Sequence, residues 1–390
     1  GGQNNDEYTV QNGKNIFIYD YKTKKNTIEN TANASVRLRD DYDVNTYDYK
    51  KLKTNTNQII PIVGANPDDG LKIGVNNIYT QYGFERNPFS ARHQFKGAYY
   101  FATNGYELNY NGEFANVIGN LNLLVQSNFQ SANFSQNFFG YGNETVNNDD
   151  IYGMDYNRVK VRDFGIAPSL VWRANGGSNL YFGLFYKSVE VEETQDRFVD
   201  NNSELPQTIF ESNQFAGVRS KFQFENYDNK AYPTIGMKTA VEVGFTTSLE
   251  DSKRNFVYMI PEVSFTHKLI PSGKLVLATQ IKSHIVFNDN FEFYQAASIG
   301  GNDGLRGFRN QRFTGQQSLF QNTDIRYTFN SLKTALLPIR IGVYGGFDYG
   351  RIWITDDNSN KWNNSYGGGF FINGVELLTA NLGLFHSIDG

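Results

Sequence analysis

Apolar and polar residues alternate along most of the chain, in segments of roughly ten residues separated by turn residues. Residues 71–82 are typical, because Leu, Ile, Val, Ile and Tyr alternate there with Lys, Gly, Asn and Thr. An alternation of period two predicts a β-strand with one apolar and one polar face. The pattern predicts fifteen strands, over residues 58–65, 71–82, 93–103, 106–114, 121–129, 159–173, 180–191, 215–226, 234–248, 256–269, 274–287, 319–329, 340–354, 366–372 and 377–386.

The connections between these segments are short at one end and long at the other. Asn104-Gly105 is a strong signal for a tight hairpin, whereas residues 130–155, 192–212 and 288–317 form long loops. Short turns on one side and long loops on the other are typical of antiparallel barrels in bacterial outer membranes. Such a meander also pairs every backbone group, as lipid requires. The sequence therefore predicts an all-β, up-and-down transmembrane barrel over residues 57–390, with a secreted β-sandwich or propeller as the alternative.

The composition supports the barrel and narrows its chemistry. The 390 residues include 25 Tyr and 32 Phe, yet the mean hydropathy is −0.52, which fits strands with one face in lipid and one in water. The net charge of −4 gives no indication of a nucleic-acid partner. The absence of Cys excludes disulfides and thiolate metal sites. No run of ~20 apolar residues predicts a transmembrane helix.

Fifteen strands is an odd number, whereas single-chain bacterial barrels have an even number. If the first predicted strand runs outward, the eleventh and the fifteenth run outward too. The 288–317 loop and the end of the chain would then both lie on the external side. We expect one closing strand to be missing from this sequence, or the count to be one short because of an additional strand before Gln58.

Residues 1–56 differ from the rest of the chain, because they are polar and rich in Asn, Lys, Asp and Thr. Short strands are expected at residues 16–19 and 35–38. We interpret this segment as a polar periplasmic linker or remnant that precedes the barrel.

A glycine-rich stretch follows the eleventh predicted strand and contains Gly304, Leu305, Arg306, Gly307 and Phe308 in succession. Arg306 has a permanent charge and five hydrogen-bond donors, so inside a barrel it requires carboxylate partners. The two glycines permit tight bends and a close approach to the wall. The order Leu-Arg-Gly-Phe resembles the sixth-external-loop motif of the BamA/TamA/FhaC superfamily of outer-membrane assembly and translocation barrels, the bacterial surface antigen barrels.

Three further stretches support the resemblance. Residues 322–327 place an acidic residue two positions before an arginine, as the strand after this loop does in the superfamily. Residues 346–350 resemble the aromatic-Asp-x-Gly pattern of its next strand, and residues 138–143 resemble an early loop of many members. The resemblance extends over residues 58–390.

The resemblance implies a sixteen-stranded barrel in the outer membrane of a Gram-negative bacterium, with the glycine-rich loop folded into the lumen. It also implies that Asp324 and Asp348, on the two strands after the loop, are the barrel-wall partners of Arg306. Relatives often have Glu at the first of these positions, and the shorter Asp324 has less reach.

The resemblance leaves the function open between two classes. Superfamily barrels insert or translocate proteins, through a seam between the first and last strands that opens into lipid. Relatives in Bacteroidetes-like bacteria, whose Asn, Tyr and Lys bias this chain shares, carry a metallophosphoesterase or a patatin-like lipase before the barrel. In them the barrel would be a membrane anchor and lipid conduit for that soluble domain. A passive porin is the third alternative.

The implied partners follow from these functions. They are outer-membrane lipids including lipopolysaccharide, unfolded client proteins or an attached soluble domain, and a second copy of the chain in a homodimer. No enzymatic activity is expected of this chain itself, since it contains no Gly-x-Ser-x-Gly, His-Glu-x-x-His or P-loop motif.

No catalytic residue, cofactor or metal site is expected. The histidines all lie in predicted strands, none at metal-ligand spacing from another, at positions 93, 267, 284 and 386. Asp149-Asp150 and Asp356-Asp357 are interpreted as solvated loop charges, with weak Ca²⁺ binding as the alternative. Aromatic residues near predicted strand ends are interpreted as the membrane-interface girdle. They are Phe291, Phe293, Tyr294, Trp353 and Trp362.

Overall fold

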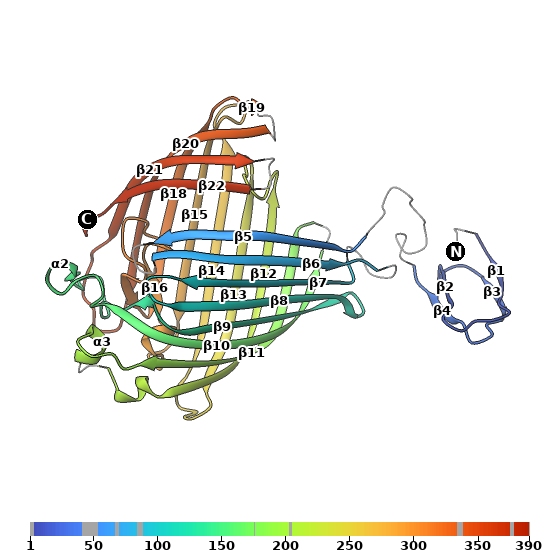
Figure 1. The fold of residues 1–390 in the computed structure, drawn as a ribbon, viewed down its shortest axis with the longest axis horizontal. Coiled ribbons are helices and arrows are strands. Elements are labelled where there is room, and N and C mark those ends of the chain that lie inside the picture. Colours follow the sequence, from blue (N-terminus) through green and yellow to red (C-terminus); the bar gives the residue numbers. More distant parts are fainter. Residues whose placement is uncertain are drawn as a thin grey trace.

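Most of the protein is one antiparallel sheet that curves into a barrel (Figure 1). Within the residues that the structure describes, no helix has the length and apolar character needed to cross a membrane. The computed structural model describes residues 4–40, 54–66, 70–83, 89–174, 176–202, 205–333, 338–374 and 378–389.

Fifteen long strands form the wall, each antiparallel to the next in the chain, and the two-residue β19 (Leu332–Lys333) pairs with β20 as the sixteenth strand of the sheet. Each predicted segment coincides with one of the long strands, so the all-β barrel is confirmed. The long strands are β5 (Thr56–Asn66), β6 (Gly70–Gln81), β7 (Ala91–Tyr100), β8 (Gly105–Ile118), β9 (Leu121–Asn137), β10 (Arg158–Arg173), β11 (Ser178–Glu192), β12 (Ser212–Tyr227), β13 (Gly236–Ser248), β14 (Asn255–Lys268), β15 (Leu275–Val286), β18 (Gln317–Thr328), β20 (Pro338–Trp353), β21 (Asn363–Gly374) and β22 (Leu378–His386).

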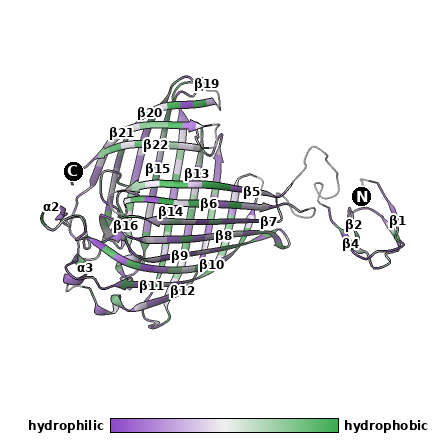
Figure 2. Cartoon of the chain, in the orientation of Figure 1, coloured by the Kyte–Doolittle hydropathy of each residue, from purple (hydrophilic) through white to green (hydrophobic). Residues whose placement is uncertain are grey.

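The outer face of the wall is apolar. On β13, Val241, Val243 and Phe245 point outward and are 40%, 42% and 39% exposed. Glu242 and Gly244 alternate with them and face the lumen. Figure 2 shows the same alternation of hydrophobic and hydrophilic residues along the other strands. An outward apolar band around a barrel is the surface that lipid covers.

The inner face of the wall is lined with paired charges. Each pair joins side chains of different strands, so the charges offset one another inside the lumen. The pairs with N–O distances of 3.2 Å or less include Lys72–Glu107, Lys96–Glu107, Arg173–Glu113, Lys187–Asp163 and Lys238–Glu262. A polar interior and an apolar exterior are the reverse of a β-sandwich, so that alternative is wrong.

The sheet is open between its two edge strands in the part of the chain that the structure describes, because its order begins at β5 and ends at β22. Fourteen antiparallel steps separate them, so both run in the same direction. On β22, Leu382 and Leu384 are 77% and 85% exposed. Residues 4–40 add no strand to this sheet, and residues 41–53 lie outside the described part. The expectation of one further closing strand stays a prediction.

Residues 4–40 form a small unit with its own pairing. The strands β1 (Glu7–Thr9) and β3 (Thr27–Asn30) are parallel, as are β2 (Phe17–Asp20) and β4 (Ser35–Leu38). The expected strands at 16–19 and 35–38 coincide with β2 and β4, whereas β1 and β3 were not expected. Asp20 is fully buried and accepts hydrogen bonds from the Tyr8 hydroxyl and the Tyr21 N–H. The division of the chain at residues 56 and 57 stays a prediction.

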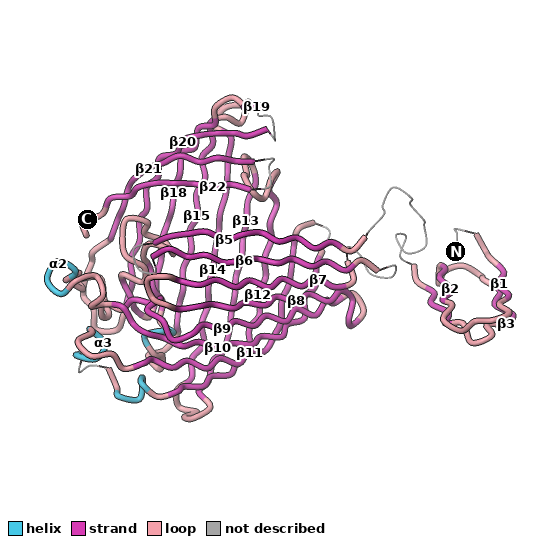
Figure 3. The backbone as a smooth tube through the Cα atoms, viewed as in Figure 1, coloured by secondary structure: helices cyan, strands magenta, loops and turns pink. Residues whose placement is uncertain are grey.

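The long loops gather at one end of the barrel, together with the end of the chain (Figures 1 and 3). We call this the external end. They contain the short helices α2 (Asp149–Tyr152), α3 (Phe198–Asn201), η1 (Gln207–Phe210) and η2 (Phe293–Gln295). A buried cluster that includes Phe138, Val199, Ile209 and Phe293 packs α3, η1 and η2 together. The loops therefore form a cap with its own hydrophobic core.

The turn between β12 and β13, at the opposite end, is organised by one carboxylate. Burial alone would raise the pKa of Asp228, but hydrogen bonds from the Thr234 hydroxyl and from the backbone N–H groups of Thr234 and Ile235 hold it below its ordinary value. A carboxyl group whose pKa is lowered in the folded protein stabilises the fold. This stabilisation is complete when the pH is above the unfolded-state pKa of about 3.9, and it is lost as the pH falls through the lower folded-state pKa.

We therefore expect Asp228→Asn to lower the urea midpoint of the refolded barrel at pH 7. The difference from wild type should shrink as the pH falls below about 4, because the wild-type carboxylate is then protonated as well. Unfolding in detergent micelles, followed by tryptophan fluorescence from pH 2 to 7, measures this. A difference that is independent of pH would contradict the role of the charge.

Candidate functional site

The loop between β15 and β18 lies inside the barrel. Its wall partners Asp324 and Asp348 alternate with Ile325 and Phe347, which are 51% and 50% exposed on the outer face. The carboxylates therefore point into the lumen, and the loop that contacts them is lumenal. It contains a short hairpin of β16 (Ala297–Ile299) and β17 (Phe313–Gly315), which the sequence did not predict. Residues 300–312, the tip of this hairpin, carry the motif.

Two glycines allow the tip to approach the wall. Gly304 has a φ of +115°, and a Cβ there would lie 2.8 Å from the Phe320 ring. A Cβ on Gly307 would lie 2.8 Å from Ser365 Cβ and 2.9 Å from the backbone of His386. Both positions therefore require glycine, the first for its backbone conformation as well as its size.

The apolar residues of the motif hold the tip against two strands of the wall. Leu305 is fully buried and Phe308 is 7% exposed. They form a cluster with the hairpin and with Phe320 of β18 and Ile352 of β20. The Phe308 and Phe313 rings meet edge to face, with centroids 5.3 Å apart. Removal of this apolar surface from water contributes to the docking of the tip.

Arg306 makes its closest contacts with Asp348 of β20. Its Nη2 lies 2.6 Å and its Nε 3.0 Å from Asp348 Oδ1, and its backbone N–H donates to Oδ2 at 2.9 Å. Asp348 also accepts from Asn322 Nδ2 at 2.7 Å and from Ser365 Oγ at 2.9 Å. This carboxylate is fully buried. Its charge is compatible with burial only because so many donors surround it.

Arg306 also contacts Asp324, on β18. Its Nη2 lies 2.8 Å from Asp324 Oδ1, so the shorter acidic side chain reaches it. The Asp324 side chain is 26% exposed and is the outer partner of the pair. The guanidinium group also lies 4.0 Å from the centroid of the Phe385 ring on β22. One side chain thus joins the loop tip to three different strands.

Two further arginines of the tip bind other parts of the external cap, and the sequence interpretation missed both. Arg309 Nη1 lies 2.6 Å from Asp149 Oδ2, on α2. Arg312 donates to Asp389, after β22, and to the Thr145 hydroxyl at 2.7 Å. The signal was present in the sequence, since these three arginines are spaced three residues apart. Their partners, however, are far away along the chain.

The early loop that resembles the superfamily docks onto the same hairpin. The Gly142 N–H donates to the Thr314 carbonyl at 3.0 Å. Asn143 is fully buried and forms two hydrogen bonds with the Ile352 backbone, at 2.8 and 3.0 Å. The stretches of residues 138–143, 322–327 and 346–350 therefore meet at one place, around the loop tip.

Two interpretations of loop residues are wrong. Asp149 is not a solvated charge, because it is paired with Arg309. Phe293 and Tyr294 are not girdle residues, because they pack inside the cap, with their ring centroids 5.2 Å apart. Burial foremost, and then the nearby Glu292 carboxylate, raises the pKa of the Tyr294 phenol above its ordinary value. The girdle role of Trp353 and Trp362 stays a prediction.

The histidines show no sign of a shared site. His93 contacts the Tyr110 hydroxyl at 3.0 Å, and the His284 ring packs edge to face on Tyr258. Among the described residues, no three His, Cys, Asp or Glu side chains gather as the ligands of a metal ion would.

Comparison with solved structures identifies the architecture. A BamA from Haemophilus ducreyi that lacks POTRA domains 1–3 superposes with a TM-score of 0.61 at 14% identity, over 87% of this chain and 68% of that one. The chain has the BamA-type barrel fold. CdiB from Escherichia coli superposes with a TM-score of 0.54 at 10% identity, over 86% of this chain and 59% of that chain. No protein-family model and no curated protein sequence matches the chain.

The BamA-type fold and the apolar outer face are those of a barrel that spans an outer membrane. The chain spans 59% of the length of the E. coli CdiB.

Proposed function

We propose that this barrel inserts proteins into the outer membrane or translocates them across it. One observation carries the proposal: the lumenal loop binds the end of an edge strand of the open sheet. The Ser387 hydroxyl donates to the Gly307 carbonyl at 2.7 Å, and Arg312 pairs with Asp389. A loop that is attached to the wall by Arg306 and to the end of β22 is placed to fix the position of that edge.

Outer-membrane lipids and unfolded client proteins are the partners that this function requires. The lipids cover the apolar outer face, and lipopolysaccharide would meet the external end of it. A client would meet the barrel at the edges β5 and β22, whose backbone groups are the ones that another strand can pair with. A homodimer formed through the same edges is a further proposal.

The experiment measures the folding of a client. The protein is reconstituted into phosphatidylcholine vesicles, and a urea-denatured eight-stranded barrel is added as client. Gel mobility without boiling follows the folded fraction over time. We expect wild type to shorten the client's folding half-time severalfold relative to empty vesicles, and Arg306→Ala to lose most of this effect because its loop is no longer attached to Asp348.

Arg162→Ala is the matched control for Arg306→Ala. Arg162 also pairs with a carboxylate, that of Glu190, but both side chains are exposed and lie on β10 and β11, strands to which Arg306 does not bind. It should retain wild-type activity. If wild type folds the client no faster than empty vesicles do, the proposed insertion function is wrong. A steady ohmic conductance in the same vesicles would then favour the porin alternative.

The anchor function is a second candidate, because residues 4–40 form a unit outside the barrel sheet. In that case the barrel would anchor a soluble domain, such as a metallophosphoesterase or a patatin-like lipase, and conduct lipid to it. The chain itself would perform no catalysis. The two functions differ in one measurable respect, because an anchor leaves the client's folding rate unchanged.

A further inference from the structure

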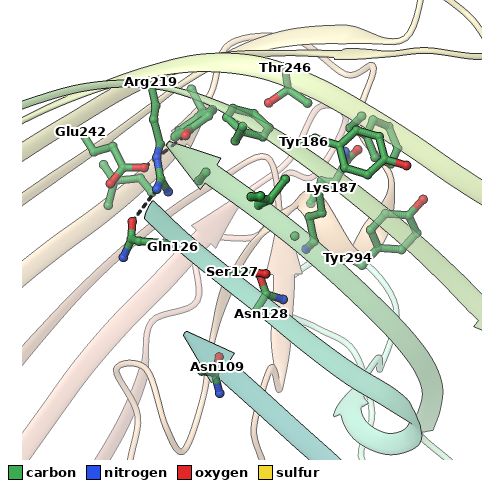
Figure 4. Close-up of a pocket in the computed structure, with 18 of the residues that line it drawn as sticks. Asn109, Gln126, Ser127, Asn128, Tyr186, Lys187, Arg219, Glu242, Thr246 and Tyr294 are labelled. Atoms are coloured by element: carbon green, nitrogen blue, oxygen red, sulfur yellow. Dashed lines mark hydrogen bonds between the residues drawn. The ribbon is translucent and has the colours of Figure 1, made fainter. Parts of the chain in front are cut away.

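A cavity in the lumen, separate from the motif, has the construction of a binding site. Its volume is about 490 Å³, within the range of small-molecule sites. The walls come from strands β8 to β15, and Tyr294 and Gln295 of η2 cover it from the external side. Figure 4 shows the polar side chains Asn109, Gln126 and Arg219 directed into this space.

Small residues on three strands leave space at the wall. Gly165 and Ala167 of β10 line the cavity directly. Gly217 of β12 and Gly244 of β13 have no side chain, and neighbouring long side chains occupy the space that they leave.

Two aromatic rings of the lining pack against glycines of the adjacent strands. A Cβ on Gly217 would meet the Phe185 ring at 2.5 Å, so that ring occupies the space that the glycine leaves on the next strand. A Cβ on Gly244 would likewise meet the Tyr258 ring. The faces of aromatic rings are electron-rich and attract C–H groups with a partial positive charge.

Amide side chains of two further strands line the same cavity. Asn109 and Asn111 lie on β8, and Gln126 and Asn128 on β9. Gln126 donates to Asn111 at 3.2 Å, and its own carbonyl accepts from Arg219 at 2.7 Å. Each amide has both a donor and an acceptor, as each hydroxyl of a polyol does.

The charges around the cavity balance one another. Lys187 pairs with Asp163 at 2.9 Å. The other charges of the lining are one cation, Arg219, and one anion, Glu242. With no net charge, the lining offers little to offset the hydration that an ionic ligand would lose on entering. The cavity therefore favours a neutral ligand.

We propose that this cavity binds a neutral sugar ring, as a mono- or disaccharide. The C–H face of the ring lies on Phe185 and Tyr258, and its hydroxyls bond to the amides of β8 and β9. The hydrogen bond between Arg219 and Gln126 closes the cavity toward a second space of about 290 Å³, which shares both residues. This bond limits the length of the ligand, and the site is independent of the client-folding function.

The test is saturation-transfer-difference NMR on the full chain, refolded in detergent micelles. The probes are maltose, cellobiose, lactose and N,N′-diacetylchitobiose, with sorbitol as an acyclic polyol and a neutral Gly-Ser octapeptide as a polypeptide. We expect transfer to the ring C–H protons of at least one of the four sugars, and at least fivefold less to sorbitol and to the peptide.

Phe185→Leu keeps an apolar side chain but removes the aromatic face, and it should reduce the transfer at least fivefold. Phe182→Leu is the matched control, because Phe182 lies on the same strand but on the lipid face, 59% exposed. Both variants are first checked for heat-resistant folding on semi-native gels. If Phe185→Leu does not fold, Asn109→Leu replaces it, with the same expected loss. The proposal is overturned if none of the four sugars shows transfer, or if sorbitol or the peptide shows as much transfer as the sugars do. It is also overturned if the folded Phe185→Leu or Asn109→Leu variant shows the same sugar transfer as wild type.

Discussion

Asp348→Ala is expected to cost about 3–5 kcal/mol of stability, because it leaves the half-buried Arg306 guanidinium without its main counter-charge and the Asn322 and Ser365 donors without their acceptor. Asp324→Ala should cost only ~1 kcal/mol, because Asp324 makes one contact with Arg306 and is partly exposed to water. The two expected losses differ because Arg306 makes several hydrogen bonds with Asp348 but only one with Asp324. Urea unfolding of the refolded barrels, read from mobility on semi-native gels, measures both values.

Two variants test whether charge or shape is responsible. Asp348→Asn preserves the size of the side chain but not its charge, and it should be destabilised nearly as much as Asp348→Ala. Glu190→Ala removes an exposed ion pair with Arg162 and should stay near wild type. Equal losses in Asp324→Ala and Asp348→Ala would show that our assignment of the main partner is wrong.

Gly307→Val is expected to cost about 1–3 kcal/mol through overpacking. The new side chain would collide with Ser365 and with the backbone of His386, and backbone cannot move aside as a flexible side chain can. The end of β22 should therefore separate from the loop tip, and the hydrogen bond between Ser387 and Gly307 should be lost. Hydrogen exchange measured by mass spectrometry over residues 378–389 should become faster.

Gly345→Val is the control for this substitution. A Cβ on Gly345 would meet only the Gly367 carbonyl, at an ordinary distance of 3.9 Å. Both glycines lie near the same sheet edge, so a general effect of valine on the strands would appear in both variants. Unchanged exchange over residues 378–389 in Gly307→Val would rule out the proposed attachment of the loop to β22.

The wall was predictable because its signal is local. The period-two alternation of strands such as β13 is written in consecutive residues, and lipid on one side and water on the other enforce it over the whole barrel. Strand ends were less predictable. The alternation indicated an end for β9 at residue 129, whereas the strand continues to Asn137 because it pairs with β10 there.

The site was predictable only in part. Arg306, Asp324 and Asp348 could be named because a motif and its strand order select them. The contacts of Arg309 and Arg312 could not, because their partners Asp149 and Asp389 are 160 and 77 residues away. Their pairing depends on how the external loops fold over the lumen.

The aromatic residues of the cap show a second limit of what can be predicted from the sequence. Phe293 and Tyr294 lie near the end of a strand, where a girdle residue and a residue of a loop core have the same local pattern. Only the packing of Phe293 against Phe138 and of Tyr294 against Phe215 shows that these are residues of the loop core. The short hairpin β16–β17 was missed for a similar reason, because three-residue strands contain too few residues to show a period.

The three arginines of the loop tip also determine the order in which the molecule can be assembled. Arg306 needs Asp348, 42 residues later, and Arg312 needs Asp389, 77 residues later. Closing such long stretches of chain has an entropic cost that precedes the contact. The tip can therefore become fixed only after β22 has joined the sheet, so the external cap cannot serve as the nucleus of folding.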